Sequence, residues 1–285
     1  MAAPVALSAA GAARTRRPHL GTLVERYILY VYTGFAVLYL LLPVAVIILF
    51  SFNKPPGRSN LVWSHFSLDA WLHPLAAPGV ANSLVASLAV AALSTLLATV
   101  LGTLMALALV RYDYRGKELT NALVFIPMAT PEIILGASLL TLYVSIGQPP
   151  FFPLGFLTIL IAHVMFNISY VVVTVRARLA DFPRHLEEVA MDLGATEAQT
   201  FWRVTFPLIL PGIVAAGLLA FSLSIDDFVI TNFTAGRTQT FPLFIYAQAR
   251  VGIPVQAYVI GTVIFLIAVS VVGLPAFLRR REAVV

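Results

Sequence analysis

The stretch HLEEVAMDLGATEAQTFWRVTFPLILPG, residues 185–212, places a polar segment with its own helix signals inside an otherwise apolar chain. Its apolar side chains recur at i, i+3, i+4 and i+7, the spacing of one helix face: Leu186, Val189, Ala190 and Leu193. The acidic Glu187, Glu188 and Asp192 point to other faces. Proline is favoured in the first turn of a helix and glycine just after its end, so the pattern predicts a helix from near Pro183 to Gly194.

A second helix is predicted directly after the first. Thr196 and Gln199 have the spacing of a capping box, in which the two side chains and backbones exchange hydrogen bonds. This helix carries Phe201 and Trp202 on one side and runs to Pro207, where another apolar segment begins. Apolar side chains displayed on such a loop favour a protein partner. The alternative is an amphipathic connection lying on lipid headgroups. Such helices are typically rich in Lys and Arg on the polar face, whereas the polar side chains here include the acidic Glu187, Glu188 and Asp192.

The composition around this loop is that of an integral membrane protein. Of the 285 residues, 60% are hydrophobic and only 11% are charged, and the mean hydropathy is +0.91. A helix of roughly 20 apolar residues crosses a bilayer core, and lipid offers no partner to an open backbone. Six stretches satisfy this length: residues 28–52, 83–110, 120–146, 152–175, 207–230 and 255–278.

The distribution of basic residues predicts the orientation of these six spans. Fourteen of the 18 Lys and Arg residues lie in the two tails and the second and fourth connections, and four lie in the other connections. Because cytoplasmic loops carry the excess of Lys and Arg, both termini and the acidic loop are expected in the cytoplasm. The net charge of +5 is thereby explained by topology, and a nucleic-acid partner is not expected.

The expected organisation follows from these boundaries. Residues 1–24 form a disordered cytoplasmic tail, residues 25–280 a six-helix transmembrane domain with the loop at about 181–206, and residues 281–285 a second cytoplasmic tail. Two outward connections, residues 53–79 and 236–254, are expected to be folded, the latter with a short helix. The chain has no cysteine, so neither a disulfide framework nor thiolate chemistry is available. No G-x-x-x-x-G-K-[ST] phosphate-binding motif occurs, so ATP hydrolysis is not expected in this chain.

Ionisable residues inside the predicted spans are few, and such residues mark functional sites in membrane proteins. Glu132 falls about 12 residues into the third span, or roughly 18 Å, which places it near the bilayer midplane. Pro131 just before it removes a backbone hydrogen bond and can open the helix locally. Glu132 is therefore a candidate for a cation path, with a structural hydrogen-bonding role as the alternative.

Asp226 and Asp227 fall near the outer boundary of the fifth span and could line the same path. Adjacent residues on a helix do not face one direction, so one of the two is expected to cap the helix or to face solvent. His163 and Asn167, one turn apart, are expected to form an interhelical hydrogen-bonding pair. Ser, His and Asp occur, but no spacing arranges them as a catalytic triad, and no metal site is indicated.

Several segments together resemble a known family. Glu188-Val189-Ala190, then Gly194, then Val204-Thr205-Phe206-Pro207 resembles the EAA signature (E-A-A, three residues, G, nine residues, I-x-L-P) of permease subunits of binding-protein-dependent ABC importers. The departures keep apolar character. Four further segments resemble the spermidine/putrescine permease branch, specifically the later-encoded of its two permease subunits: residues 111–117, 131–133, 171–175 and 224–229.

The resemblance implies an all-α type I ABC importer permease fold in the inner membrane. It implies that the loop couples to an ATPase through Glu188, Val189, Ala190, Leu193, Gly194 and Pro207. The implied partners are a second permease subunit, an ATP-binding subunit dimer that holds ATP and Mg, and an extracytoplasmic substrate-binding protein. This chain itself would hold no cofactor. The alternatives are another solute, such as ferric iron or an opine-like amino acid, and a proton-coupled secondary transporter.

Overall fold

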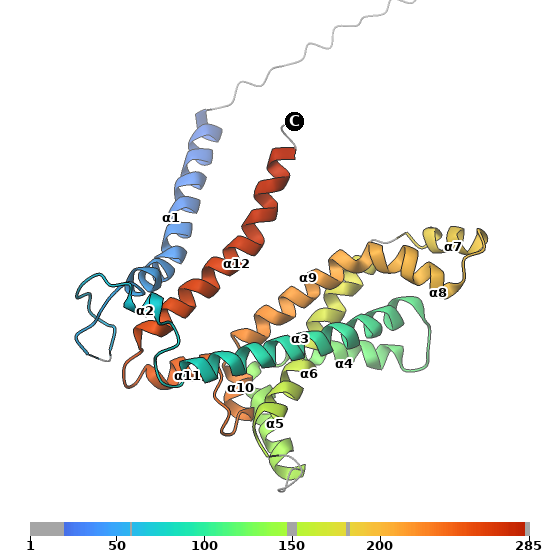
Figure 1. The fold of residues 1–285 in the computed structure, drawn as a ribbon. Helices are drawn as coiled ribbons and strands as arrows, with labels where there is room; N and C mark the ends of the chain where they lie inside the picture. The colour runs from blue at the N-terminus through green and yellow to red at the C-terminus, as the bar shows by residue number, and fades with distance from the viewer. Residues whose placement is uncertain (1–19, 58, 147–152, 181–182, 283–285) are drawn as a thin grey trace, which may run out of the picture.

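The structure is a computed structural model that describes residues 20–57, 59–146, 153–180 and 183–282, with side chains from 27 to 271. The predicted tails therefore lie largely outside the described residues. Over the described ranges the chain is helical, and the sole strand-like feature is a bridge between Asn53 and Phe66. Figure 1 shows a central bundle, a pair of helices that stands apart from it, and a helical loop at the far end.

Three long helices form the core of the bundle: α3 (Val80–Arg111), α6 (Phe156–Ala180) and α9 (Phe206–Ile225). Their contacts are made by small and β-branched residues that bury one apolar cluster. A Cβ at Gly102 of α3 would lie 2.7 Å from Val171 Cγ1 of α6, so the two backbones approach as closely as glycine allows. Small residues at such contacts are typical of helices packed in a membrane, where dispersion and close packing replace the hydrophobic effect.

The third predicted span is not one continuous helix. It consists of α4 (Lys117–Ala129) and α5 (Glu132–Ile146), which meet at an angle of 109°. Thr130 between them is extended, because the ring of Pro131 disfavours the helical conformation in the residue before it. The prediction of a local opening at Pro131 is confirmed. Glu132 lies directly after this break, in the first turn of α5, and its position near the bilayer midplane stays a prediction.

The bent segment packs on a short helix that follows α9. This helix, α10 (Val229–Thr234), lies against α5 and α6. A Cβ at Gly136 of α5 would lie 2.6 Å from Phe233 Cδ2 of α10, so the contact again depends on glycine. The expected fifth span, residues 207–230, thus ends at Ile225, and its last residues belong to a separate helix.

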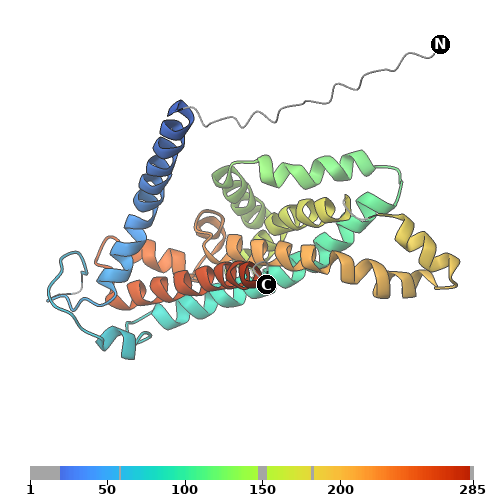
Figure 2. The same ribbon diagram turned by 90° about the horizontal axis from the view of Figure 1, so that it is seen from above.

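The first and last helices, α1 (Leu20–Phe50) and α12 (Val255–Glu282), lie outside the bundle. They contact each other near Phe50 and Tyr258 and diverge from there (Figures 1 and 2). No position of the apolar span Tyr27–Phe50 is buried by the rest of the chain. Such an apolar surface needs lipid or another subunit around it. Figure 2 shows α1 pointing away from the bundle, which leaves most of this surface accessible to either.

The described residues contain four helices that are long and apolar enough to cross a membrane, or five spans if α4 and α5 count as one. The side chains of α12 are described only to Val271, and that part is shorter than the 18 residues used for a span. The predicted number of six spans and the cytoplasmic position of both termini therefore stay predictions.

Both connections that are predicted to face outward contain folded structure. In the first, Asn53 donates to Asn60 Oδ1 at 2.7 Å, and α2 (Asp69–Leu72) follows. In the second, the expected short helix is α11 (Phe241–Gln248), and its Phe244 is buried against Val80 at the start of α3.

Candidate functional site

The first helix of the polar loop is α7 (His185–Asp192), which begins two residues later than the sequence predicts. It ends where expected, because Gly194 adopts a left-handed conformation with φ +90°. Two hydrogen bonds, from Gly194 N to Met191 O and from Ala195 N to Ala190 O, close the helix end in the Schellman arrangement. Asp181, which stands just before Phe182-Pro183 in the sequence, lies outside the described residues.

The second helix of the loop begins with the predicted capping box. Gln199 N donates to Thr196 Oγ1 at 3.3 Å, and Thr196 N donates to Gln199 Oε1 at 3.0 Å. The expected end at Pro207 is wrong, because α8 (Glu197–Thr200) continues through a π-helical turn, η1 (Phe201–Thr205), directly into α9. Pro207 lies at the start of α9 and removes one backbone donor, and the π turn before it changes the bonding pattern without ending the helix.

The loop displays apolar side chains, as the sequence predicts. Leu193 is 84% exposed and Trp202 is 63% exposed, while Leu186 and Val189 are also accessible. Glu188 is exposed beside them, Ala190 is half-buried, and Pro207 is exposed. Figure 1 shows α7 and α8 beyond the ends of α3 and α9, where a partner can reach them. The coupling role of these residues stays a prediction.

The sequence did not distinguish Glu187 from its neighbour, and the structure does. Its Oε1 atom lies 2.6 Å from Nη2 of Arg111, the last residue of α3, and also accepts a hydrogen bond of 2.6 Å from Thr205 in the π turn. The three side chains line a cleft of about 520 Å³ between the end of α3 and the loop. A basic residue at the end of a span that is predicted to be cytoplasmic was the one signal for this pair, and it does not reveal which acidic residue Arg111 meets.

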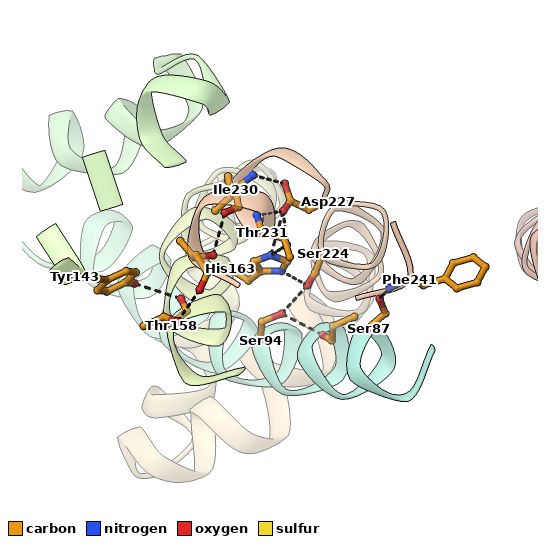
Figure 3. Close-up of polar contacts among 12 residues, drawn as sticks. Ser87, Ser94, Tyr143, Thr158, His163, Ser224, Asp227, Ile230, Thr231 and Phe241 are labelled. Carbon is orange, nitrogen blue, oxygen red and sulfur yellow. Dashed lines mark hydrogen bonds and ion pairs between the residues drawn. The ribbon is translucent and has the colours of Figure 1, made fainter. Parts of the chain in front are cut away.

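A buried polar network connects the core helices in the opposite half of the bundle (Figure 3). His163 of α6 is hydrogen-bonded through Nδ1 to Ser224 Oγ of α9 at 2.6 Å and through Nε2 to Thr231 Oγ1 of α10 at 2.9 Å. Ser224 Oγ lies 2.9 Å from Ser94 Oγ of α3. His163 Nε2 also lies 3.2 Å from Asp227 Oδ2. The imidazole thereby joins α6 to α9 and α10, and Ser224 extends the network to α3.

The expected interhelical hydrogen bonding is confirmed for His163 but not for Asn167. Asn167 is completely buried, and within the described part of the chain neither of its amide atoms has a hydrogen-bond partner. The structure brings Ser224, His163 and Asp227 together in one chain of polar contacts, which no spacing in the sequence indicates. The hydroxyl of Ser224 is buried and already bonded within the bundle, so the chain is an interhelical connection and not an exposed nucleophile.

The two aspartates have different surroundings. The side chain of Asp227 is 8% exposed, and its carboxylate accepts bonds from the backbone N–H groups of Ile230 and Thr231 at the start of α10. Asp226, the last residue before this turn, is exposed. The expectation that one of the pair caps a helix thus holds for Asp227. Glu132 is exposed as well, so among the three candidates for the path Asp226 and Glu132 are the accessible ones.

Solved structures share the fold of this chain. A bacterial ABC transporter involved in the import of the acidic polysaccharide alginate matches with a TM-score of 0.66 at 18% identity, over 92% of this chain and 100% of that chain. An amino acid ABC transporter matches with a TM-score of 0.56 at 16% identity, over 76% of this chain and 100% of that chain. These likenesses show the ABC importer permease fold.

Curated relatives match most of the chain in sequence. The spermidine/putrescine transport system permease protein PotC of Haemophilus influenzae is 33% identical over 245 residues, which cover 86% of this chain and 93% of that protein. The putrescine transport system permease protein PotI of Escherichia coli is 35% identical over 254 residues, with 88% and 89% covered. The model of the family "Binding-protein-dependent transport system inner membrane component" matches residues 98–281. The chain is therefore a multi-pass inner-membrane protein that belongs to this family of ABC importer permeases.

Proposed function

We propose that this chain is a permease subunit of an ATP-driven importer of polyamines, such as putrescine and spermidine. The observation that carries the proposal is the identity of 33–35% to spermidine/putrescine and putrescine permease proteins across more than four fifths of the chain. The structural neighbours are below 20% identical and have no bearing on the solute. Family membership contradicts the alternative of a proton-coupled secondary transporter.

The assembly in this proposal has four kinds of subunit. The chain pairs with a second permease, two ATP-binding subunits hydrolyse ATP with Mg in the cytoplasm, and a binding protein delivers the solute from outside. The uncovered apolar surface of α1 supports a permease partner, and the exposed apolar loop supports a cytoplasmic one. Six spans with both termini in the cytoplasm complete the proposed topology. ATP and Mg stay with the partner, because this chain has no phosphate-binding motif.

The proposed mechanism converts closure of the ATPase into movement of the bundle. The surface around Glu188, Val189, Ala190, Leu193 and Gly194 docks on the ATP-binding subunit. Because α8 continues without a break into α9, displacement of the loop moves a core helix directly. The resulting path is lined in part by Glu132 and Asp226, whose carboxylates attract a polycation and repel anions.

Uptake of labelled putrescine and spermidine in a deletion strain tests the solute. The full set of subunits restores uptake, and the same set with a hydrolysis-deficient ATP-binding subunit does not. Undiminished polyamine uptake in the deletion strain, together with lost uptake of ferric iron or of an opine-like amino acid, would overturn the proposal in favour of that other solute.

A further inference from the structure

We propose that Glu187 is a positioning residue that transmits the movement of α7 to the ends of two core helices. The inference rests on the proposed function and deepens it. It assigns different roles to adjacent acidic residues of the loop: Glu188 meets the ATP-binding subunit, and Glu187 holds the loop to its own membrane helices.

The geometry converges on one carboxylate. Glu187 lies on α7, and its Oε1 atom bonds both to Arg111 at the end of α3 and to Thr205 in the π turn that leads into α9. Both distances are 2.6 Å, at the short end for such bonds. A shift of α7 therefore acts on two of the three core helices through a single side chain.

The helical geometry of α7 separates the two roles. Successive residues on an α-helix point about 100° apart, since 3.6 residues complete a turn. Glu187 consequently faces the end of α3 while Glu188 is exposed. A docking surface requires an accessible residue, and a connection to the bundle requires an inward one.

Partial burial makes the connection specific. The side chains of Arg111 and Glu187 are 14% and 17% exposed, so water screens their attraction less than at an open surface. Removal of one charge from a buried pair costs far more than removal from an exposed one. The ion pair thus fixes the position of α7 relative to α3, so a movement of α7 also moves the end of α3.

The same side of the bundle offers a matched control. Lys117 Nζ lies 2.8 Å from Asp113 Oδ1, and the Asp113 side chain is 99% exposed. The neighbouring Lys117 ammonium holds the pKa of Asp113 below its usual value, yet this pair joins residues four apart on one segment. Its removal changes the charge of the cytoplasmic surface and breaks no connection between elements.

The test uses the complete complex in proteoliposomes with its binding protein. Three quantities are measured: the affinity of the ATP-binding subunits for the permease pair, the ratio of binding-protein-stimulated to basal ATPase activity, and solute import. Glu187→Gln should lower the stimulation ratio and import on the order of tenfold while the affinity is unchanged. Glu188→Lys should instead lower the affinity.

A charge exchange separates transmission from simple folding. Glu187→Arg combined with Arg111→Glu restores an opposite-charge contact and should recover most of the stimulation ratio that either single change loses. Lys117→Ala should behave as the wild type in all three measurements. The proposal is overturned if Glu187→Gln keeps the wild-type stimulation ratio, if it lowers affinity and stimulation in parallel, or if the exchange recovers nothing.

The outcome for the solute is read separately. If the wild-type complex shows stimulated ATPase activity without polyamine import, the solute proposal fails, whereas the stimulation ratio of the Glu187→Gln variant still decides the role of this residue.

Discussion

Replacement of His163 by leucine tests the polar network at the centre of the bundle. Leucine is of similar size and removes three polar contacts, those with Ser224, Thr231 and Asp227. A polar contact between membrane helices contributes about 0.6 kcal/mol, so removal of the three contacts lowers the free energy of unfolding by about 2 kcal/mol. The Asp227 carboxylate keeps its bonds to the start of α10, so the cost stays below the roughly 3–5 kcal/mol of breaking a buried ion pair. We expect a loss of about 2–3 kcal/mol.

The free energy of unfolding is measured in mixed micelles with SDS as the denaturant. A double-mutant cycle of His163→Leu and Asp227→Asn isolates the contact between these two side chains. Asp226→Asn is the matched control, because this neighbouring carboxylate is exposed, and its change should be below about 0.5 kcal/mol. A loss of less than about 0.5 kcal/mol for His163→Leu would refute the reasoning, since the network would then contribute nothing to the packing of the helices.

Three other predictions follow from the same structure. Glu188→Lys reverses an exposed charge on the loop, so the protein should insert and fold normally while ATP-driven import is lost, and wild-type uptake would contradict the coupling role. Glu132→Gln should reduce import of divalent and higher cations more than it reduces ATPase docking, and an unchanged import rate would make Glu132 a structural residue. Gly102→Leu meets Val171 and should cost about 1–3 kcal/mol in the SDS assay, whereas Gly34→Leu, with open space around it, should cost nothing measurable.

Features formed by neighbouring residues could be predicted from the sequence. The capping box at Thr196 and Gln199 and the left-handed Gly194 involve atoms within a few residues of one another. Their hydrogen bonds form in the same way wherever the loop is placed. The break at Pro131 was anticipated for the same reason, since a proline ring acts on the residue before it.

Features that depend on partners far along the chain could not be predicted. His163 contacts Ser224 and Thr231, which lie 61 and 68 residues away, and the sequence predicted bonds to other helices without indicating these partners. Arg111 and Glu187 are 76 residues apart. Helix periodicity gives the face on which a residue lies, but not which other helix meets that face.

The sequence by itself determined the class of protein, the polar loop with its helix caps, and the charged residues that stand out in an apolar chain. These depend on transfer of side chains from water and on local backbone hydrogen bonding. Only the tertiary structure decided that α4 and α5 meet at 109°, that Glu187 points inward while Glu188 stays exposed, and that Asp227 is bonded while Asp226 is accessible. The physical reason is that burial and hydrogen bonding of a side chain are set by the packing of several helices together, and no single segment contains that information.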